Sequence, residues 1–448
     1  MTDASASLAP SPAPASRRGR AVLLVDNEAN PYSRGLRVAR SLAADGWQVE
    51  IAAVGDGGLP SEERDPTDPS IVIRRYEPSG PWARWSVGRE AAGARPRMGR
   101  RSLRERLRRV PGLALRLVAW PIQARGWWAT LRRELPPADL YHAFGILAIP
   151  VALALAADAR GRGRHPVVVY DVIDVVLESN NVARVPRPFL AWYRRREAGW
   201  VRHADAVVTV NDAIADHLAR TWPVRRRPTV LLNCQPRWDA PGTRPDLIRS
   251  VTGIPLERRI VLFLGRLGRE RGLEEASEAV LRLDDAALVL LGFGPWAERL
   301  HERDDDPRLR GHHFTLPAVH PDDVPGWTAS ADVSIVAVPA NSLNQRLSSP
   351  NKFWESLAAG TPVVVGRDLV VMRGIVEQEG LGAVGDPADP ADLARALREV
   401  LDLPRGDYEA MRARCLAVTH DRYNWEAAVG PYLDLVRGLT SRDADVSG

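Results

Sequence analysis

Lysine is nearly absent from this chain of 448 residues, in which lysine and arginine together number 61 and Lys352 is the only lysine. A GC-rich coding sequence favours arginine and explains the deficit without any function. The one lysine lies in the stretch SSPNKFWESLAAGTPVVV, Ser348 to Val365. One lysine can occur at any position by chance. Only its neighbours in the sequence can indicate whether this position needs an ammonium rather than a guanidinium group.

Cysteine is also scarce, and the chain has no long apolar run. Cys234 and Cys415 lie far apart and lack metal-ligand spacing, so we expect no disulfide framework, a cytoplasmic setting and inert packing roles for both. The longest apolar run, residues 146–157, is about half of the ~20 residues that a membrane-spanning helix needs. We therefore expect no transmembrane helix.

Charge of neither sign dominates. The formal net charge is only +5, which argues against a general nucleic-acid-binding protein. Residues 1–18 are rich in Ala, Ser and Pro and lack the apolar centre of a signal peptide, so we expect a disordered tail. The length predicts two or three domains.

The chain divides into two halves in which strands alternate with helices. In the first half, apolar runs predict strands over residues 21–27, 47–55, 71–77, 139–145, 166–174, 204–211 and 229–233. A helix over residues 33–46 completes a βαβ unit, and the continuous apolar runs are typical of parallel strands buried on both faces. We expect one α/β domain over residues 19–235.

The same pattern restarts in the second half. Strands are predicted over residues 259–268, 286–295, 331–340 and 361–366, and helices over residues 273–283, 351–360, 389–403 and 423–439. The boundary falls near residues 235–249. We expect a second α/β domain over residues 236–415 and a final helical segment over residues 416–440.

Residues 82–135 break the pattern. From Arg95 to Arg109 there are eight arginines and one acid, Glu105. Five tryptophans flank or follow this run: Trp82, Trp85, Trp120, Trp127 and Trp128. Arginine with interfacial tryptophan is typical of a helix on an anionic membrane. The alternative is a solvated basic face with the tryptophans packed on the core.

Two strand ends in the second half carry glycine. Gly265 and Arg266 end one strand, and Arg271 follows before the next helix. Ligands bind beyond the carboxyl ends of parallel strands, where glycine admits a close approach and arginine clamps phosphate. Gly292 and Gly294 end the next strand, although a tight turn needs glycine in any case.

The stretch around Lys352 predicts a helix that begins beside an anion. Two serines and a proline precede the helix, and Gly360 ends it. A helix N-terminus suits a phosphate, whereas a cation in the first turn is unfavourable unless an anion is present. Glu355 shares the helix face with Lys352, so the alternative is a simple surface ion pair.

Together these segments resemble the retaining, nucleotide-sugar-dependent glycosyltransferases of family 4, over about residues 20–439. The resemblance rests on GRLGRERG, LGFGP, ASADVSIVAVP, SPNKFWESLAAGTPVVV and YNWE. It implies the GT-B fold: two Rossmann-like domains that face each other across a cleft, with the last helix crossing back to the first domain. It also implies transfer with retention of configuration, without a cofactor and without an obligatory metal.

The resemblance places the sugar donor in the second domain. It implies that Arg266 and Arg271 contact the donor diphosphate, that Glu355 binds the ribose hydroxyls, and that His142 lies near the sugar. With Lys352, the two arginines and the histidine are the expected catalytic residues. The other expected donor contacts are Gly265, Gly292, Gly294, Val319, Ser348, Ser349, Pro350 and Asn351.

One position departs from the family pattern. Leu347 stands where many members carry the first of two glutamates, so the sugar-facing role of that acid is vacant or has shifted to Asn344. This departure keeps open a non-catalytic GT-B module that binds nucleotide or glycan. A nucleotide-sugar epimerase is a further alternative, but the acid and base that it needs are not visible.

Acceptor contacts are expected from the first domain. Asn30, Arg34, Asp171 and Asp174 follow predicted strands there, and the alternative for each is capping or loop hydrogen bonding. The acidic run at residues 303–307 follows a helix rather than a strand, so we interpret it as a surface loop and not as a metal site.

These observations predict a glycosyltransferase that moves a sugar from a nucleotide-sugar to a hydroxyl group. The acceptor is expected to be a lipid-linked molecule or a glycan of the cell envelope, an exopolysaccharide or a glycolipid. We expect a cytoplasmic protein, held at the inner face of the membrane through residues 95–109, and no nucleic-acid partner.

Overall fold

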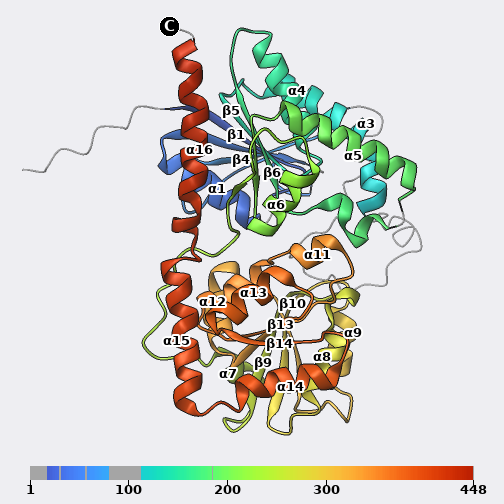
Figure 1. Cartoon of the computed structure of the whole chain (residues 1–448), viewed down its shortest axis with the longest axis vertical. Helices are drawn as coiled ribbons and strands as arrows, with labels where there is room; N and C mark the ends of the chain where they lie inside the picture. Colours follow the sequence, from blue (N-terminus) through green and yellow to red (C-terminus); the bar gives the residue numbers. More distant parts are fainter. Residues whose placement is uncertain (1–17, 30–31, 56–57, 80–112, 184, 447–448) are drawn as a thin grey trace, which may run out of the picture.

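A computed structural model describes residues 18–446 except residues 30–31, 56–57, 80–112 and 184. Asn30, most of the expected tail and the basic run at residues 95–109 therefore lie outside the described residues. The described chain forms two α/β domains, one above the other in Figure 1.

The N-terminal domain is built on an eight-stranded sheet with the order β3-β4-β2-β1-β5-β6-β7-β8. Its strands are β1 (Gly19–Val25), β2 (Trp47–Val54), β3 (Glu62–Arg64), β4 (Val72–Tyr76), β5 (Leu140–Phe144), β6 (Val167–Val172), β7 (Ala206–Thr209) and β8 (Thr229–Val230). The described pairs are parallel except β3 with β4. Because β3 is short and all three of its residues are exposed and charged, it has no apolar pattern that sequence reasoning could detect.

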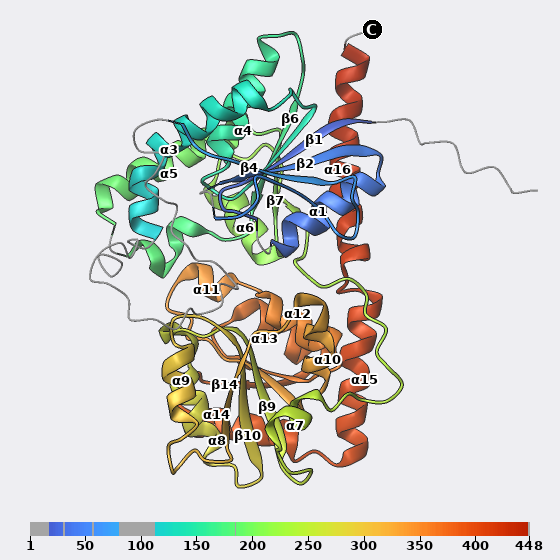
Figure 2. The ribbon, with the colours of Figure 1, turned by 180° about the vertical axis from the view of Figure 1, so that it is seen from behind.

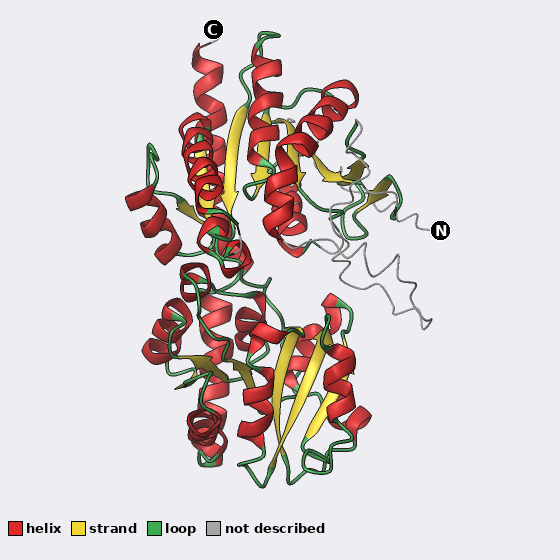
Figure 3. Cartoon of the chain, turned by 90° about the vertical axis from the view of Figure 1, so that its right-hand side faces the viewer, coloured by secondary structure: helices red, strands yellow, loops and turns green. Residues whose placement is uncertain are grey.

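Helices cover both faces of this sheet (Figure 3). They are α1 (Ser33–Ala44), α3 (Leu113–Glu134), α4 (Ile149–Arg160), α5 (Arg187–His203) and α6 (Asp212–Thr221), with short 3-10 turns η1 (Val176–Glu178) and η2 (Asn180–Val182). Alternate residues of β1 join different hydrophobic clusters, Val22 and Leu24 on one face and Leu23 on the other. Burial on both faces explains the continuous apolar runs.

The C-terminal domain has a six-stranded parallel sheet with the order β11-β10-β9-β12-β13-β14. Its strands are β9 (Arg259–Arg266), β10 (Ala286–Phe293), β11 (His313–Pro317), β12 (Val333–Val336), β13 (Val363–Gly366) and β14 (Gly382–Gly385). Its helical segments are α7 (Leu247–Thr252), η3 (Arg269–Arg271), α8 (Leu273–Val280), α9 (Ala297–Arg303), η4 (Pro321–Asp323), α10 (Val324–Ala329), α11 (Leu343–Leu347), α12 (Asn351–Ala358), α13 (Val370–Glu379) and α14 (Pro390–Leu401).

The last two helices join the domains. Figure 2 shows α15 (Arg405–Asp421) beside the C-terminal domain and α16 (Trp425–Val446) beside the N-terminal domain. Trp425, Tyr432 and Val436 of α16 are buried in a cluster with residues of β1 and α1. The chain thus crosses back to its first domain, which confirms the predicted fold class.

The scarce cysteines and several tryptophans have packing roles. Cys234 and Cys415 are free and buried, and burial raises the pKa of each thiol to about 12, so the expected inert roles are confirmed. Trp120 and Trp127 are buried in the N-terminal core. For these two tryptophans, packing on the core, and not membrane contact, is the correct interpretation.

Candidate active site

The glycines at the ends of β9 and β10 meet at one edge of the C-terminal sheet. Gly265 pairs with Gly292 in register, and a Cβ atom on Gly292 would lie 1.8 Å from the Gly265 carbonyl oxygen. Gly294 has a φ of +141°, and a Cβ atom there would lie 2.3 Å from the Leu267 carbonyl oxygen. Close backbone packing therefore requires glycine at both positions, and contact with a donor remains a prediction.

Lys352 lies in the first turn of α12 and points back at β9. Its Nζ is 3.5 Å from the centroid of the Phe263 ring, and its Cε would be 3.8 Å from a Cβ atom on Gly265. The residue is only 8% exposed. Among the described residues, Nζ has no hydrogen-bond partner, so an expensive buried ammonium is left unsatisfied.

Nearby charges make the charged form of Lys352 more unfavourable still. The pKa of Lys352 is held well below its usual value, first by burial and then by repulsion from Arg271, against a smaller opposing effect of Glu355. The pKa of Arg271 is lowered by burial and by Arg266. Three cationic side chains thus converge at the end of β9 and the start of α12. A bound anion would relieve their mutual repulsion.

Glu355 lies one turn along α12 and is half-buried. Burial raises the pKa of its carboxyl group to about 7, with Arg37 and Lys352 acting in the opposite direction. Gln235 Nε2 donates a hydrogen bond to Glu355 Oε1 over 3.2 Å. Because Lys352 is buried and Glu355 is half-buried, the structure excludes the alternative of a simple Lys–Glu surface pair.

Arg37 of α1 reaches this site from the other domain. Its guanidinium donates to the carbonyl oxygen of Cys234 (2.7 Å), to Gln235 Oε1 (3.0 Å) and to Asn233 Oδ1 (2.7 Å). Asn233 Nδ2 in turn donates to Asn351 Oδ1 over 2.6 Å. Sequence reasoning missed Arg37 because one arginine on an amphipathic helix carries no distinguishing signal.

The loop before α12 is also held by the N-terminal domain. Asn211 Nδ2 donates to the Leu347 carbonyl oxygen (2.8 Å) and lies 3.3 Å from Ser349 Oγ. Pro350 precedes α12 in an extended conformation without a side-chain cap, so this helix start presents backbone N–H groups as an anion site requires. Donor contacts by residues 348–351 remain a prediction.

The other two expected donor contacts differ in their surroundings. Asn344 Nδ2 donates to Asp174 Oδ1 (3.0 Å), and Asn344 Oδ1 accepts from the Val175 N–H (2.7 Å). Asn344 and Asp174, expected to bind donor and acceptor, thus contact one another across the domains. Val319 is half-buried and packs against a cluster of the C-terminal core.

His142, Arg34 and Asp171 form a closed network inside the N-terminal domain. Arg34 donates to both carboxylate oxygens of Asp171 (2.9 and 3.0 Å). His142 lies between Asp171 Oδ2 (3.2 Å) and the Tyr432 hydroxyl (2.9 Å). His142 and Asp171 are 0% exposed, and burial lowers the pKa of His142. In this conformation the three side chains are buried and bond to one another, and their contact with a substrate remains a prediction.

The acidic run at residues 303–307 follows α9, as expected. Asp304 there accepts hydrogen bonds from the Thr315 N–H (3.0 Å) and contacts His313 Nδ1 (2.6 Å), so it ties the end of α9 to β11. Across the described residues, no group of three or more His, Cys, Asp or Glu side chains is arranged to hold a metal ion.

The fold defines a class, the GT-B proteins: two Rossmann-like α/β domains, with a final helix that crosses back to the first domain. In the second domain, three cationic side chains lie beside the glycines at the strand ends. Residues 36–234 match the family described as Glycosyltransferase Family 4, and residues 246–417 match Glycosyl transferases group 1. The chain belongs to these GT-B glycosyltransferases and is a transferase.

Curated relatives agree with this assignment. The chain is 27% identical over 399 residues to 2-deoxystreptamine glucosyltransferase of Streptomyces kanamyceticus, covering 84% of this chain and 91% of that protein. It is 29% identical over 189 residues to a GDP-mannose-dependent phosphatidylinositol monomannoside mannosyltransferase of Mycobacterium tuberculosis, covering 41% of this chain and 48% of that protein.

Solved structures share the fold. Sucrose-phosphate synthase from Thermosynechococcus elongatus superposes with a TM-score of 0.66 at 18% identity, covering 94% of this chain and 100% of that one. The Anabaena protein HepE in complex with UDP-glucose gives a TM-score of 0.63 at 15% identity, covering 94% and 99%. Within the described part of the chain, no helix is long and apolar enough to cross a membrane.

Proposed function

We propose that this glycosyltransferase moves a sugar from a nucleotide-sugar donor to an acceptor hydroxyl. The observation that carries the proposal is Lys352, a buried ammonium without a hydrogen-bond partner among the described residues, beside Arg271. A diphosphate would satisfy both groups. The mannosyltransferase relative is named GDP-mannose-dependent and the HepE structure holds UDP-glucose, which supports a donor of this class.

The proposed chemistry depends on charge stabilisation. When the bond between the sugar and the diphosphate breaks, negative charge grows on the departing phosphate. Arg266, Arg271 and Lys352 would stabilise that charge, together with the N–H groups at the start of α12. Glu355, one turn on, would accept hydrogen bonds from the ribose hydroxyls, and Val319 would lie near the base.

We further propose retention of configuration, by attack from the donor's own face and without a protein nucleophile or an obligatory metal. The resemblance to family 4 supports this part of the proposal. The anomeric configuration of the product, measured by NMR before it equilibrates, tests retention, and an inverted product would contradict it. Turnover in the presence of a chelator tests the proposal that no metal is required.

A screen of UDP-, GDP- and ADP-sugars tests the central proposal. One of them should raise the melting temperature and then be turned over with an acceptor. Binding without turnover would favour the non-catalytic module, and interconversion of the sugar without transfer would favour the epimerase. If no nucleotide-sugar shifts the melting temperature, the proposal is wrong.

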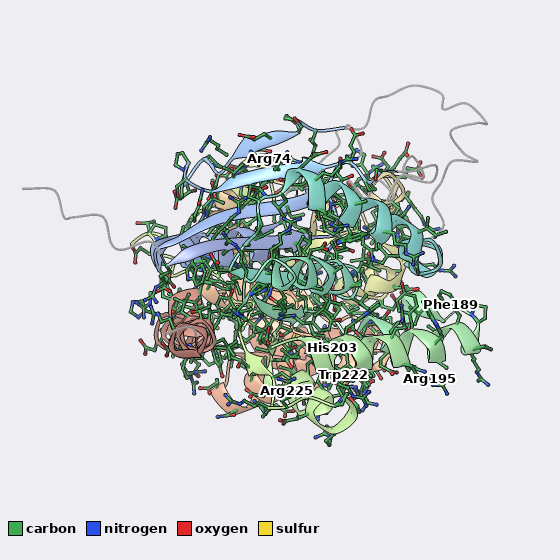
Figure 4. The ribbon with its side chains drawn as sticks, turned by 90° about the horizontal axis from the view of Figure 1, so that it is seen from above. Arg74, Phe189, Arg195, His203, Trp222 and Arg225 are labelled. Carbon is green, nitrogen blue, oxygen red and sulfur yellow. The ribbon has the colours of Figure 1, made fainter. Side chains whose placement is uncertain are left out.

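We also propose that the acceptor belongs to the cell envelope and is met at an anionic membrane surface. Beyond residues 95–109, support comes from α5, on which Arg187, Arg195, Arg196 and Arg202 are exposed and Glu197 is buried. Exposed Trp192 stacks on Phe189, with ring centroids 5.5 Å apart. Figure 4 shows Phe189 towards one end of α5, Arg195 near its middle, and His203 at the other end, beside Trp222 and Arg225.

Vesicle flotation tests this surface. The variant R195E/R196E should bind vesicles of anionic lipid more weakly than the wild type, and deletion of residues 95–109 should weaken binding further. The matched control is R310E/R405E, which makes the same charge change at exposed positions of the C-terminal domain. Equal flotation of all variants, or flotation of none including the wild type, would overturn the membrane proposal.

A further inference from the structure

A short helix of the C-terminal domain, α11, reaches across to the N-terminal domain. Both polar atoms of the Asn344 side chain are used there: Nδ2 donates to Asp174 Oδ1 (3.0 Å) and Oδ1 accepts from the Val175 N–H (2.7 Å). The adjacent Gln345 Oε1 accepts from Asn180 Nδ2 over 3.1 Å. The side-chain amides of α11 in the C-terminal domain thus contact the segment that follows β6 in the N-terminal domain.

The end of α11 adds an apolar contact to these hydrogen bonds. Leu347 packs against the hydrophobic cluster of the N-terminal domain, although it belongs to the other domain. An acid at this position would have to bury its charge against apolar side chains, which is costly. Leucine, at the position where the resemblance to family 4 leads one to expect glutamate, therefore has a structural use as an interdomain contact.

Asn211 then connects this contact to the start of α12. Its Oδ1 caps α6 by accepting from the Ile214 N–H (2.9 Å), while its Nδ2 donates to the Leu347 carbonyl oxygen (2.8 Å) and lies 3.3 Å from Ser349 Oγ. The residue is 2% exposed. A residue of the N-terminal domain thereby fixes the backbone that leads directly to the anion site of the C-terminal domain.

We propose that residues 343–349 form a domain clasp, which engages when the two domains close and then holds the loop at residues 348–351 in its donor-binding shape. Asn211 and Asn344 are positioning residues in this proposal, since neither needs to touch a reacting atom. The role given to the loop rests on the proposed function. The interdomain contact itself does not.

The chemistry of the clasp suits a reversible contact. The side chains that make its contacts are amides, Leu347 and the Ser349 hydroxyl, with Asp174 as the one charged partner, and both Asp174 and the nearby Arg346 are exposed. Opening therefore returns neutral groups to water and leaves no buried charge behind. Because protein–water hydrogen bonds replace the interdomain ones, each contributes only modestly to closure, and a ligand can shift the balance between open and closed forms.

An Asn–Asp exchange tests the contact without removing side chains. Asn344→Asp places a second carboxylate against Asp174 and should open the clasp. Adding Asp174→Asn should close it again, because the new amide can donate to the new carboxylate. Asn341→Asp is the matched control: it makes the same change three residues earlier, where the side chain is exposed.

Two readouts separate the clasp from the proposed function. Small-angle scattering without nucleotide should show a larger radius of gyration for N344D than for the wild type, N341D and N344D/D174N. Calorimetry with UDP, GDP and ADP should show about tenfold weaker binding for N344D and restored binding in the double variant. Equal radii for all four proteins would overturn the clasp, whereas no nucleotide binding to the wild type would count against the proposed function alone.

Asn211→Ser tests the second step, from the clasp to the loop. Serine keeps an N-cap for α6 but cannot reach the Leu347 carbonyl. We expect the KM for the donor to rise about fivefold to tenfold with a smaller change in kcat. The reason is that a positioning contact of this kind contributes the free energy of one or two hydrogen bonds. A lower melting temperature with an unchanged KM would show that Asn211 is merely structural and would overturn its positioning role.

Discussion

The two domains bury charge in opposite ways. In the N-terminal domain, a network of hydrogen bonds joins the ion pair of Arg34 and Asp171 to His142 and Tyr432. The histidine and the aspartate of this network have no exposed surface. In the C-terminal domain, Lys352 is almost as deeply buried, yet its ammonium has no hydrogen-bond partner in the described part of the chain, and Arg271 repels it.

This contrast separates a structural group from a binding group. A buried charge that is fully paired contributes to holding strands and helices together, and removing one partner leaves the other exposed to the apolar interior. A buried charge without a partner weakens the free protein and gains its partner from a ligand. The same burial therefore predicts loss of stability in one domain and loss of activity in the other.

The largest effect on stability is expected from Asp171→Ala. The substitution leaves the buried guanidinium of Arg34 unpaired, so the free energy of unfolding should fall by about 3–5 kcal/mol, measured by urea denaturation. Asp216→Ala is the control, because Asp216 forms an exposed pair with Arg227 and should cost less than about 1 kcal/mol. Equal losses would remove the contrast between the domains.

Lys352→Met should separate activity from stability. We expect donor turnover to fall about 100-fold, the usual cost of losing one preorganised group that stabilises transition-state charge. The melting temperature should stay the same or rise, because methionine removes an unsatisfied buried ammonium. A marked fall in stability with normal turnover would mean that Lys352 is a packing residue like those of the N-terminal network.

Exchanging the two kinds of cation should have a smaller effect. Lys352→Arg forces a wider group between the Phe263 ring and Gly265, and such overpacking typically costs 1–3 kcal/mol, so we expect turnover to fall about tenfold. The reciprocal variant, Arg271→Lys, should lose less, because Arg271 is only half-buried. Steady-state kinetics of both variants would show whether the single lysine of the chain is required, and near-normal turnover by Lys352→Arg would show that it is not.

The pH dependence of stability should carry the smallest effect. The pKa of Glu355 is raised from 4.5 to about 7 by burial, so the folded protein binds this proton more tightly than the unfolded chain. The stabilisation that this proton provides is complete below about pH 4.5 and is lost as the pH rises towards 7. Over that range the free energy of unfolding should fall by at most about 1.4 kcal/mol per pH unit. In Glu355→Gln this slope should be absent from thermal denaturation curves, and an unchanged slope would assign the titration to another group.

Apolar periodicity was enough to predict the two α/β halves, whereas the resemblance to family 4 implied the GT-B arrangement and the crossing of the final helix between the domains. The runs that became β1, β6 and β9 are buried on both faces, which makes them continuous in the sequence. The strand β3, Glu62–Arg64, was not predictable because all three of its residues are exposed. The helix α11 was missed because five residues are too few for a helical period.

Only those residues of the candidate site that belong to a local sequence motif were predictable. Lys352 and Glu355 stood out because a helix start, a glycine stop and a lone lysine occur together. Arg37, Asn211 and Gln235 reach the same site from positions more than a hundred residues away in the sequence, and nothing in their local sequence distinguishes them from surface residues. Their partners are set by how the two domains meet.

The sequence by itself determined the two α/β halves, the glycine-rich strand ends and the cationic helix start, because each depends on residues close together along the chain. Only the tertiary structure decided that Lys352 is buried without a hydrogen-bond partner among the described residues, that His142, Arg34 and Asp171 are bonded to one another, and that Leu347 serves as an interdomain contact. The physical reason is that pairing and burial depend on which distant segments a side chain meets, and a linear pattern does not specify those neighbours.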